Sequence, residues 1–164
     1  MAEKITRARI TETAFHILES EGFEALTLKH LAKSLGIRTP SLYNHIKNAQ
    51  DLHESLAISG WQRLAEQLTH VSLLEAAAVV YRRFVREQTA LYMLMSQHTQ
   101  KAVPLLNQLR VFMPPGPEKD IVHATYSTWS LLHGFMVLEQ QNEARPETFN
   151  YLLRTLRTLN GLKS

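Results

Sequence analysis

Residues 27–46 read TLKHLAKSLGIRTPSLYNHI, two short helical patterns on either side of one glycine, Gly36. Gly36 ends the first pattern, because a residue without Cβ adopts the left-handed conformation at little cost. In the second pattern Leu42 and Ile46 share a face, which leaves the polar side chains around them outside. A helix, a short turn with glycine and a second helix with a polar face form the helix-turn-helix pattern. The inward face of the first helix consists of Leu28, Leu31, Ala32 and Leu35.

Both short helices carry signals for where they begin. Thr27 precedes the first apolar pattern as an N-cap, whose hydroxyl accepts a hydrogen bond from a free backbone N–H. Thr39 is the expected N-cap of the second helix, and Pro40 follows at the first helical position, where its missing N–H costs nothing. We therefore expect each helix to begin directly after its threonine.

The positive charge of the chain is concentrated on this stretch. The formal net charge is only +3, but no acidic residue lies between Glu24 and Asp51. Such a basic segment is the electrostatic footprint of a surface that contacts DNA phosphates. A solvated basic face is the alternative, and the helix-turn-helix pattern favours DNA. The basic side chains are Lys29, Lys33, Arg38 and Lys47, joined by His30 and His45.

The composition excludes several other classes of protein. The 164 residues include no cysteine, which excludes disulfides, thiol catalysis and cysteine-bound zinc. The eight histidines form no HExxH pair, and the Walker, GxSxG and GxGxxG motifs are absent. We expect no enzyme, no catalytic or metal-binding residues and no cofactor. The polar N-terminus and the lack of an apolar run of about 20 residues predict a cytoplasmic protein with no membrane partner.

Apolar side chains recur at helical spacing along the rest of the chain, which predicts an all-α fold. A three-helix head is expected to be joined by a long helix to a C-terminal helical domain. Pro104 and the cluster at 114–117 interrupt the later pattern. Besides the two short helices, the expected ranges are 3–20, 48–70, 73–97, 103–112, 118–142 and a last helix that begins at Pro146.

Several motifs together resemble the DNA-binding head of the tetracycline-repressor (TetR) family of bacterial transcriptional regulators. They are Glu21-Gly22-Phe23, LAKSLGI at 31–37 and PSLYNHI at 40–46, within about a third of the chain. The string WSLLHGFMVLE at 129–139 also resembles a Trp…His-Gly pattern in one class of TetR C-terminal domains. The resemblance implies a helix-turn-helix DNA-binding domain at 1–48 and a helical ligand-binding and dimerisation domain at 49–164.

The resemblance also implies which side chains contact DNA. The second helix would supply Thr27 and Lys29, and the third helix would lie in the major groove. Tyr43 and His45 match phosphate anchors of the family, although each has a structural alternative, as a half-buried ring or as a helix cap. Ala49 occupies a position where the family often has a basic residue. The candidate set is Thr27, Lys29, Arg38, Thr39, Pro40, Ser41, Tyr43, Asn44, His45 and Lys47, in which Thr39, Pro40 and Ser41 would face the base edges.

Two sets of candidate functional residues are expected in the C-terminal domain. The first is a candidate ligand pocket of aromatic and histidine side chains, each of which could instead be core. The second is a dimer interface, because the last two long helices of TetR subunits form an intermolecular four-helix bundle. The pocket set is Trp61, Phe84, Met95, His98, Tyr126, Trp129 and His133. The interface set is Tyr126, Gly134, Phe149, Leu153 and Leu156.

Taken together, these features predict a homodimeric, sequence-specific transcriptional regulator. It is expected to act as a repressor that a small apolar or amphipathic effector releases from a palindromic operator in double-stranded DNA. The alternative is a helical dimerisation or interaction protein whose TetR-like head does not read DNA, and the alanine at position 49 is its only support.

Overall fold

The computed structural model describes residues 5–161, and within this range the chain forms helices and no strand. The predicted all-α fold is therefore confirmed. The contacts between residues divide the chain into two compact units. None of the described helices is both long and apolar enough to cross a bilayer.

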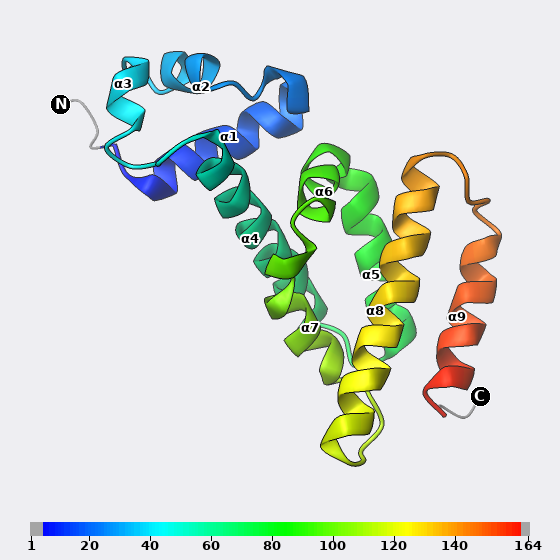
Figure 1. Cartoon of the computed structure of the whole chain (residues 1–164). Helices are drawn as coiled ribbons and strands as arrows, with labels where there is room; N and C mark the ends of the chain where they lie inside the picture. The colour runs from blue at the N-terminus through cyan, green and yellow to red at the C-terminus, as the bar shows by residue number, and fades with distance from the viewer. Residues whose placement is uncertain (1–4, 162–164) are drawn as a thin grey trace. The chain divides into compact units, whose positions relative to one another are not determined.

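The first unit holds the helix-turn-helix stretch. It extends to Gly60 and includes Ala90–Lys101. Figure 1 shows α2 and α3 grouped with α1 and the start of α4. Their shared core contains Ile10, Leu31 and Leu42, none of which is exposed. The elements are α1 (Arg7–Glu21), η1 (Phe23–Ala25), α2 (Leu28–Ser34), α3 (Thr39–Leu42), the first part of α4 (Ala49–Leu68), nearly all of α6 (Thr89–Ser96) and η2 (Thr99–Lys101).

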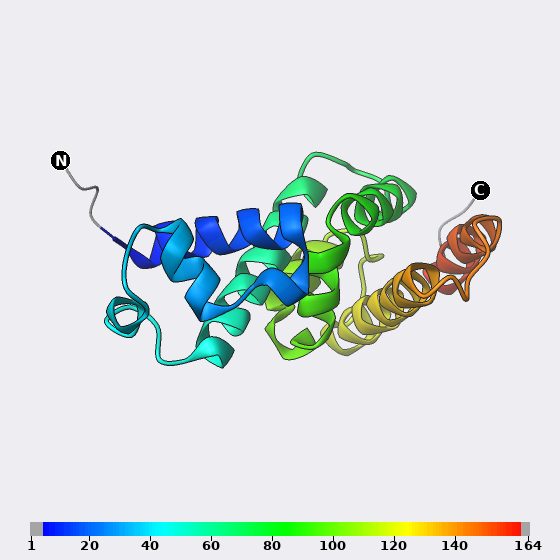
Figure 2. The same cartoon turned by 90° about the horizontal axis from the view of Figure 1, so that it is seen from above.

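The second unit is organised around its longest helix, α8 (Glu118–Gln140). It comprises Trp61–Thr89 and the chain from Ala102 onward, and so begins within α4. The helix α8 packs against its neighbours in this unit, and both views show α8 and α9 side by side (Figures 1 and 2). The neighbours are α5 (Leu74–Glu87), α7 (Val103–Arg110) and α9 (Thr148–Leu159).

The structure corrects several predicted boundaries. The single helix expected at 73–97 is wrong, because Gln88 leaves the helical conformation (φ −123°, ψ 47°) and the chain restarts at Thr89 as α6. The N-cap of α3 is Arg38 rather than Thr39, and α9 begins at Thr148 rather than at Pro146. The predicted first helix also began too early, and its positions 3 and 4 lie outside the described residues.

The predicted domain boundary after residue 48 falls at the start of α4. By contacts, the first 12 residues of α4 and the 90–101 segment belong with the head. The division into domains at 48 therefore remains a prediction, and the compact units are a different partition of the same chain.

An ion pair joins α5 to α8 inside the second unit. The Arg82 Nε atom donates to both carboxylate oxygens of Glu139 at 3.0 Å, and the Arg82 guanidinium lies 4.5 Å from the centroid of the Phe149 ring. Only 18% of the Arg82 side chain and 12% of the Glu139 side chain are exposed. Removing one member of such a pair leaves the other charge poorly solvated.

We expect Arg82→Met to lower the free energy of unfolding by about 2 kcal/mol, less than for a fully buried pair because both groups keep some contact with water. Urea unfolding measures the difference. Arg110→Met is the matched control, because Arg110 pairs with a largely exposed carboxylate, that of Glu118. Equal effects of the two substitutions would contradict a special role for the Arg82 pair.

Candidate nucleic-acid interface

The turn between α2 and α3 is set by local hydrogen bonds. The Thr27 hydroxyl accepts from the backbone N–H of His30 at 3.1 Å, which confirms the predicted cap of α2. Gly36 has φ +69°, and the N–H groups of Gly36 and Ile37 donate to the carbonyls of Lys33 and Ala32. These two bonds form a Schellman motif, which requires a left-handed residue at the glycine position.

The regular part of α3 is only four residues long, Thr39–Leu42. The chain continues beyond it in tight turns, and the N–H groups of His45 and Ile46 both donate to the carbonyl of Leu42. Leu42 and Ile46 are buried, as predicted. They fix the short helix to the head and leave its opposite face open to solvent.

No member of the predicted DNA-binding set is buried, and the set lies on α2, on α3 and on the turns beside α3. Tyr43 is 54% exposed, which argues against the alternative of a half-buried ring. The half-buried members are Thr39, Ser41 and His45, and the exposed members are Thr27, Lys29, Arg38, Pro40, Tyr43, Asn44 and Lys47.

The lysines and the arginine of this face form no ion pair within the described part of the chain, although the charge of Lys47 acts on the Asp51 carboxylate. Lys29, Lys33, Arg38 and Lys47 are all exposed, and none makes an ion pair there. An unpaired cation is available to a phosphate, since no protein carboxylate must first be displaced. Ala49 is exposed at the first position of α4 and adds no charge to the face.

A hydrogen-bond network that the sequence did not predict holds the segment after α3. The Arg7 guanidinium donates to the His45 carbonyl at 3.2 Å, to the Asp51 carboxylate at 2.8 Å and to the Ser55 hydroxyl at 2.6 Å. The other Asp51 oxygen accepts from the backbone N–H of Lys47 at 2.9 Å. This network ties the start of α1 to the start of α4 and positions the backbone at two candidate contact residues.

The network accounts for the arginine at the start of α1. A cation is unfavourable near a helix N-terminus, and Arg7 is compensated by the carboxylate of Asp51. Asn48 caps the start of α4, because its side-chain oxygen accepts from the backbone N–H of Asp51 at 2.9 Å. No short-range pattern marks the Arg7 contact, whose partners lie 38 to 48 positions away.

Four of the predicted pocket residues come together in the second unit. The Trp129 ring lies 5.4 Å from His133, 6.2 Å from Trp61 and 6.5 Å from Tyr126 between centroids. The Trp129 Nε1 atom is buried without a hydrogen-bond acceptor in the described chain. Burial lowers the pKa of His133, so its ring is neutral at pH 7. We call Trp61, Tyr126, Trp129 and His133 the aromatic cluster.

The other predicted pocket residues are placed differently. Phe84 is buried in the second unit, whereas Met95 and His98 are buried in the first. Tyr126 also lines a small hollow of about 150 Å³ between α7 and α8. The structure therefore brings together only the four residues of the aromatic cluster, and the ligand pocket remains a prediction.

The residues of the predicted dimer interface fall into buried and exposed groups. Phe149 and Leu156 are 5% and 0% exposed because they pack inside their own chain, so neither is offered to a second subunit. Leu153 is half-buried. Tyr126 is 51% exposed, and a Cβ at Gly134 would meet no heavy atom within 4 Å. The apolar stripe of α9 thus packs within its own chain at these two residues, and the interface set remains a prediction.

Two family models match the chain. The model of the bacterial regulatory proteins of the tetR family matches residues 10–56, which contain α2 and α3. The model of the tetracyclin repressor-like C-terminal domain matches residues 74–156, half of the chain. The chain belongs to the tetR family of bacterial regulatory proteins. The predicted TetR resemblance is confirmed, while its assignment to the Trp…His-Gly class remains a prediction.

Similar proteins agree with this family assignment. YobS, an uncharacterized HTH-type transcriptional regulator of Bacillus subtilis, is 30% identical in an alignment 179 positions long. The alignment covers 96% of this chain and 93% of YobS. A TetR-family transcriptional regulator from Streptomyces coelicolor shares the fold with a TM-score of 0.72 and 17% identity, over 94% of this chain and 97% of that one. The structure of BioQ with its double-stranded DNA operator has a TM-score of 0.64 and 20% sequence identity. The match covers 97% of this chain and 98% of BioQ. As a tetR-family member, the chain is a transcriptional regulator and not an enzyme.

The Asp51 carboxylate gives the tetR-type head a dependence on pH. The hydrogen bond from Arg7, then that from the Lys47 backbone, holds the pKa of Asp51 below its ordinary 3.8. A lowered pKa in the folded state means that the stabilisation is complete above pH 3.8 and is lost as the pH falls through the lowered value.

We expect the free energy of unfolding to fall more steeply below about pH 4 for the natural chain than for Asp51→Asn, with the two converging at still lower pH. Urea unfolding from about pH 6 to about pH 2 measures this. Asp120→Asn serves as the control, because Asp120 is an exposed carboxylate of α8 without an ion pair in the described chain. Parallel profiles for the natural chain and Asp51→Asn would show that the network does not stabilise the head.

Proposed function

We propose that the chain is a homodimeric repressor that binds a palindromic DNA operator with its two heads. The observation that carries this proposal is the exposed face of α2 and α3, whose lysines and arginine form no ion pair in the described chain. BioQ, which shares the fold, has a structure with its own operator bound, and this supports the same use of the face here. A two-fold protein requires a two-fold site, with recognition helices about 34–36 Å apart or a multiple of that distance.

The α3 segment would read bases and the residues around it would bind phosphates. Ser41 can bond to more than one base, and Pro40 can contact a thymine methyl group, so base recognition at these positions is permissive. Tyr43 and Lys47 would fix the register on the backbone without reading sequence. The Arg7 network supports this arrangement, because it holds the backbone at His45 and Lys47 in place.

The dimer would form through the exposed side of α8 and α9. Ser127, Ser130, Gly134 and Leu138 follow one another at intervals of three and four, so they share one face of α8. Small side chains there permit close approach of a second helix. On α9, Tyr151 and Leu159 are 68% and 61% exposed. We define this set as the α8–α9 face. Of the predicted interface it keeps only Gly134 and omits Tyr126, Phe149, Leu153 and Leu156.

A small apolar or amphipathic effector would bind at the aromatic cluster. The unbonded Trp129 N–H supports a ligand that carries a hydrogen-bond acceptor, since a buried donor without a partner is unfavourable. The helix α4 is continuous from the head into the second unit, which offers a route for coupling. The effector would release DNA only to the extent that it prefers the DNA-free form of the dimer.

Selection from a random duplex pool with the full chain tests this function. A palindrome should be enriched, and its binding should weaken steeply as salt rises. Ser41→Ala should enrich the same palindrome with relaxed preference at one position in each half-site. Absence of any enriched palindrome, together with absence of salt-dependent binding at low ionic strength, would favour the alternative of an interaction protein that does not read DNA.

A further inference from the structure

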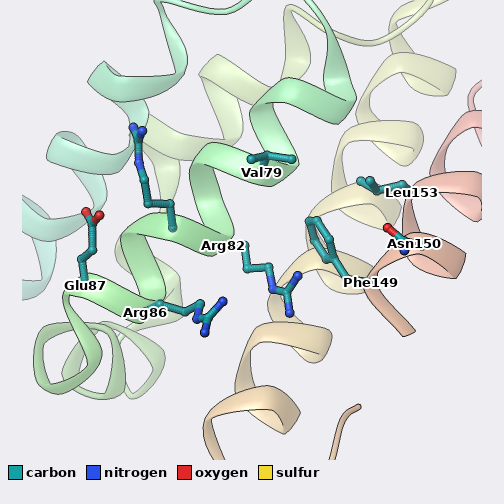
Figure 3. A pocket seen from close by; sticks show the side chains of 8 residues that line it. Val79, Arg82, Arg86, Glu87, Phe149, Asn150 and Leu153 are labelled. Carbon is teal, nitrogen blue, oxygen red and sulfur yellow. The ribbon is translucent and has the colours of Figure 1, made fainter. Parts of the chain in front are cut away.

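A groove of about 600 Å³ separates α5 from α9 in the second unit. It is distinct from the aromatic cluster, none of whose members lines it. Figure 3 shows Arg82 and Arg86 extending from α5 toward Phe149, while Val79 of α5 faces Leu153 of α9 farther along. The groove therefore has a cationic end and an apolar end, with an aromatic ring between them.

The charges that line the groove are not balanced within the chain. Arg82 is neutralised by Glu139 and stacks on the Phe149 ring, so it acts as a fixed wall. Arg83 and Arg86 are exposed and make no ion pair in the described residues. Among the described residues, Glu87 is the one carboxylate that lines the groove. Arg83 and Arg86 carry two positive charges and Glu87 one negative charge, so with Arg82 paired to Glu139 the lining has a net charge of +1.

The other end of the groove is lined by apolar side chains, which gain no hydrogen bonds from contact with water. Val79 is 53% exposed, although it is a β-branched apolar residue. Leu153 is half-buried across the gap, and Phe149 lines the groove but is itself buried. A hydrocarbon chain placed there would remove apolar surface from water on both helices at once.

We propose that this groove binds a monoanionic amphiphile, an alkyl carboxylate of medium chain length. The carboxylate accepts two hydrogen bonds from the Arg86 guanidinium, whose planar fork matches it. The alkyl chain lies between Val79 and Leu153, at the end of the groove away from Arg86. One negative charge on the ligand balances the one net positive charge of the groove.

Calorimetric titration of the full chain with decanoate, without DNA, tests the proposal independently of operator binding. We expect one saturable site per chain. Arg86→Gln should weaken decanoate binding about tenfold, the loss expected for a charge-assisted contact. Arg154→Gln is the matched control, because it removes the same charge from α9 outside the groove and should leave the affinity within about twofold.

Ligand variation tests the two ends of the groove separately. Affinity should rise about threefold per methylene from hexanoate to decanoate, and Val79→Asn should reduce that gain. Decanol should bind more weakly than decanoate, and Arg86→Gln should not affect it. The proposal is overturned if decanoate binding does not saturate, if decanol binds as tightly, or if Arg86→Gln and Arg154→Gln have equal effects. It is also overturned if Arg86→Gln changes the oligomeric state in sedimentation without changing decanoate binding, since the groove would then be a contact between copies.

Discussion

Replacing Gly134 with arginine is expected to leave the chain folded but monomeric, and to weaken operator binding by about a hundredfold or more. Gly134 lies within α8 on the proposed α8–α9 face, and beyond the adjoining backbone of α8 a Cβ there would meet no heavy atom within 4 Å. A glycine inside a helix is less favourable than most other residues by about 0.5–1 kcal/mol, so the substitution should not destabilise the monomer. The arginine would instead fill the space that a second α8 needs.

The size of the effect on DNA follows from linkage of the two heads. When one head is bound, the dimer holds the second near its half-site at a high effective concentration, which strengthens binding by about 10²–10⁴. A monomer loses this factor, although its phosphate contacts are intact. Sedimentation measures the oligomeric state, and anisotropy titration of a labelled operator measures the affinity.

Gly116→Arg provides the control for the added charge. Gly116 also has open space around its Cβ position, but it lies in the loop before α8, outside the proposed face. This variant should stay dimeric and bind the operator as well as the natural chain does. If Gly134→Arg sedimented as a dimer with unchanged operator affinity, the α8–α9 face would not be the dimer interface.

The helix-turn-helix segment was predictable because its determinants are local. Gly36 ends α2 through its own backbone conformation, and Leu42 and Ile46 are inward by helical spacing alone. The same spacing puts the polar residues of α3 outside. The cap at Thr27 depends on a contact three residues away, which a sequence pattern can express.

Other features depend on contacts that a linear pattern does not contain. No glycine or proline marks the break at Gln88, and the apolar spacing continues through it, so the sequence favoured one helix where there are two. Phe149 and Leu156 belong to an apolar stripe that predicts burial, but not whether the same chain or a second one buries it. The Arg7 contacts span most of the head, and only the folded arrangement brings these residues together.

Lys47→Ala and Tyr43→Phe are expected to weaken operator binding in different ways, because they remove a charged and a neutral contact. Each substitution acts twice in a dimer. Loss of two lysine–phosphate contacts should reduce the slope of log affinity against log salt by about two, and the affinity by about tenfold or more at 0.1 M salt. Loss of two phenol hydrogen bonds should reduce the affinity by about tenfold and leave the slope unchanged. Anisotropy titrations at several salt concentrations give both quantities.

The two variants should lose the same affinity for the operator and for an unrelated duplex, because phosphate contacts carry no sequence information. Lys119→Ala controls for net charge, since Lys119 is an exposed lysine of α8 outside the head. If the slope of log affinity against log salt were unchanged in Lys47→Ala, Lys47 would not contact a phosphate. With Ala49 uncharged beside it, the segment after α3 would then have no cation on the DNA, and binding would depend on α2 and Arg38. The salt dependence of operator binding by Lys47→Ala therefore decides whether Lys47 compensates for the alanine at position 49.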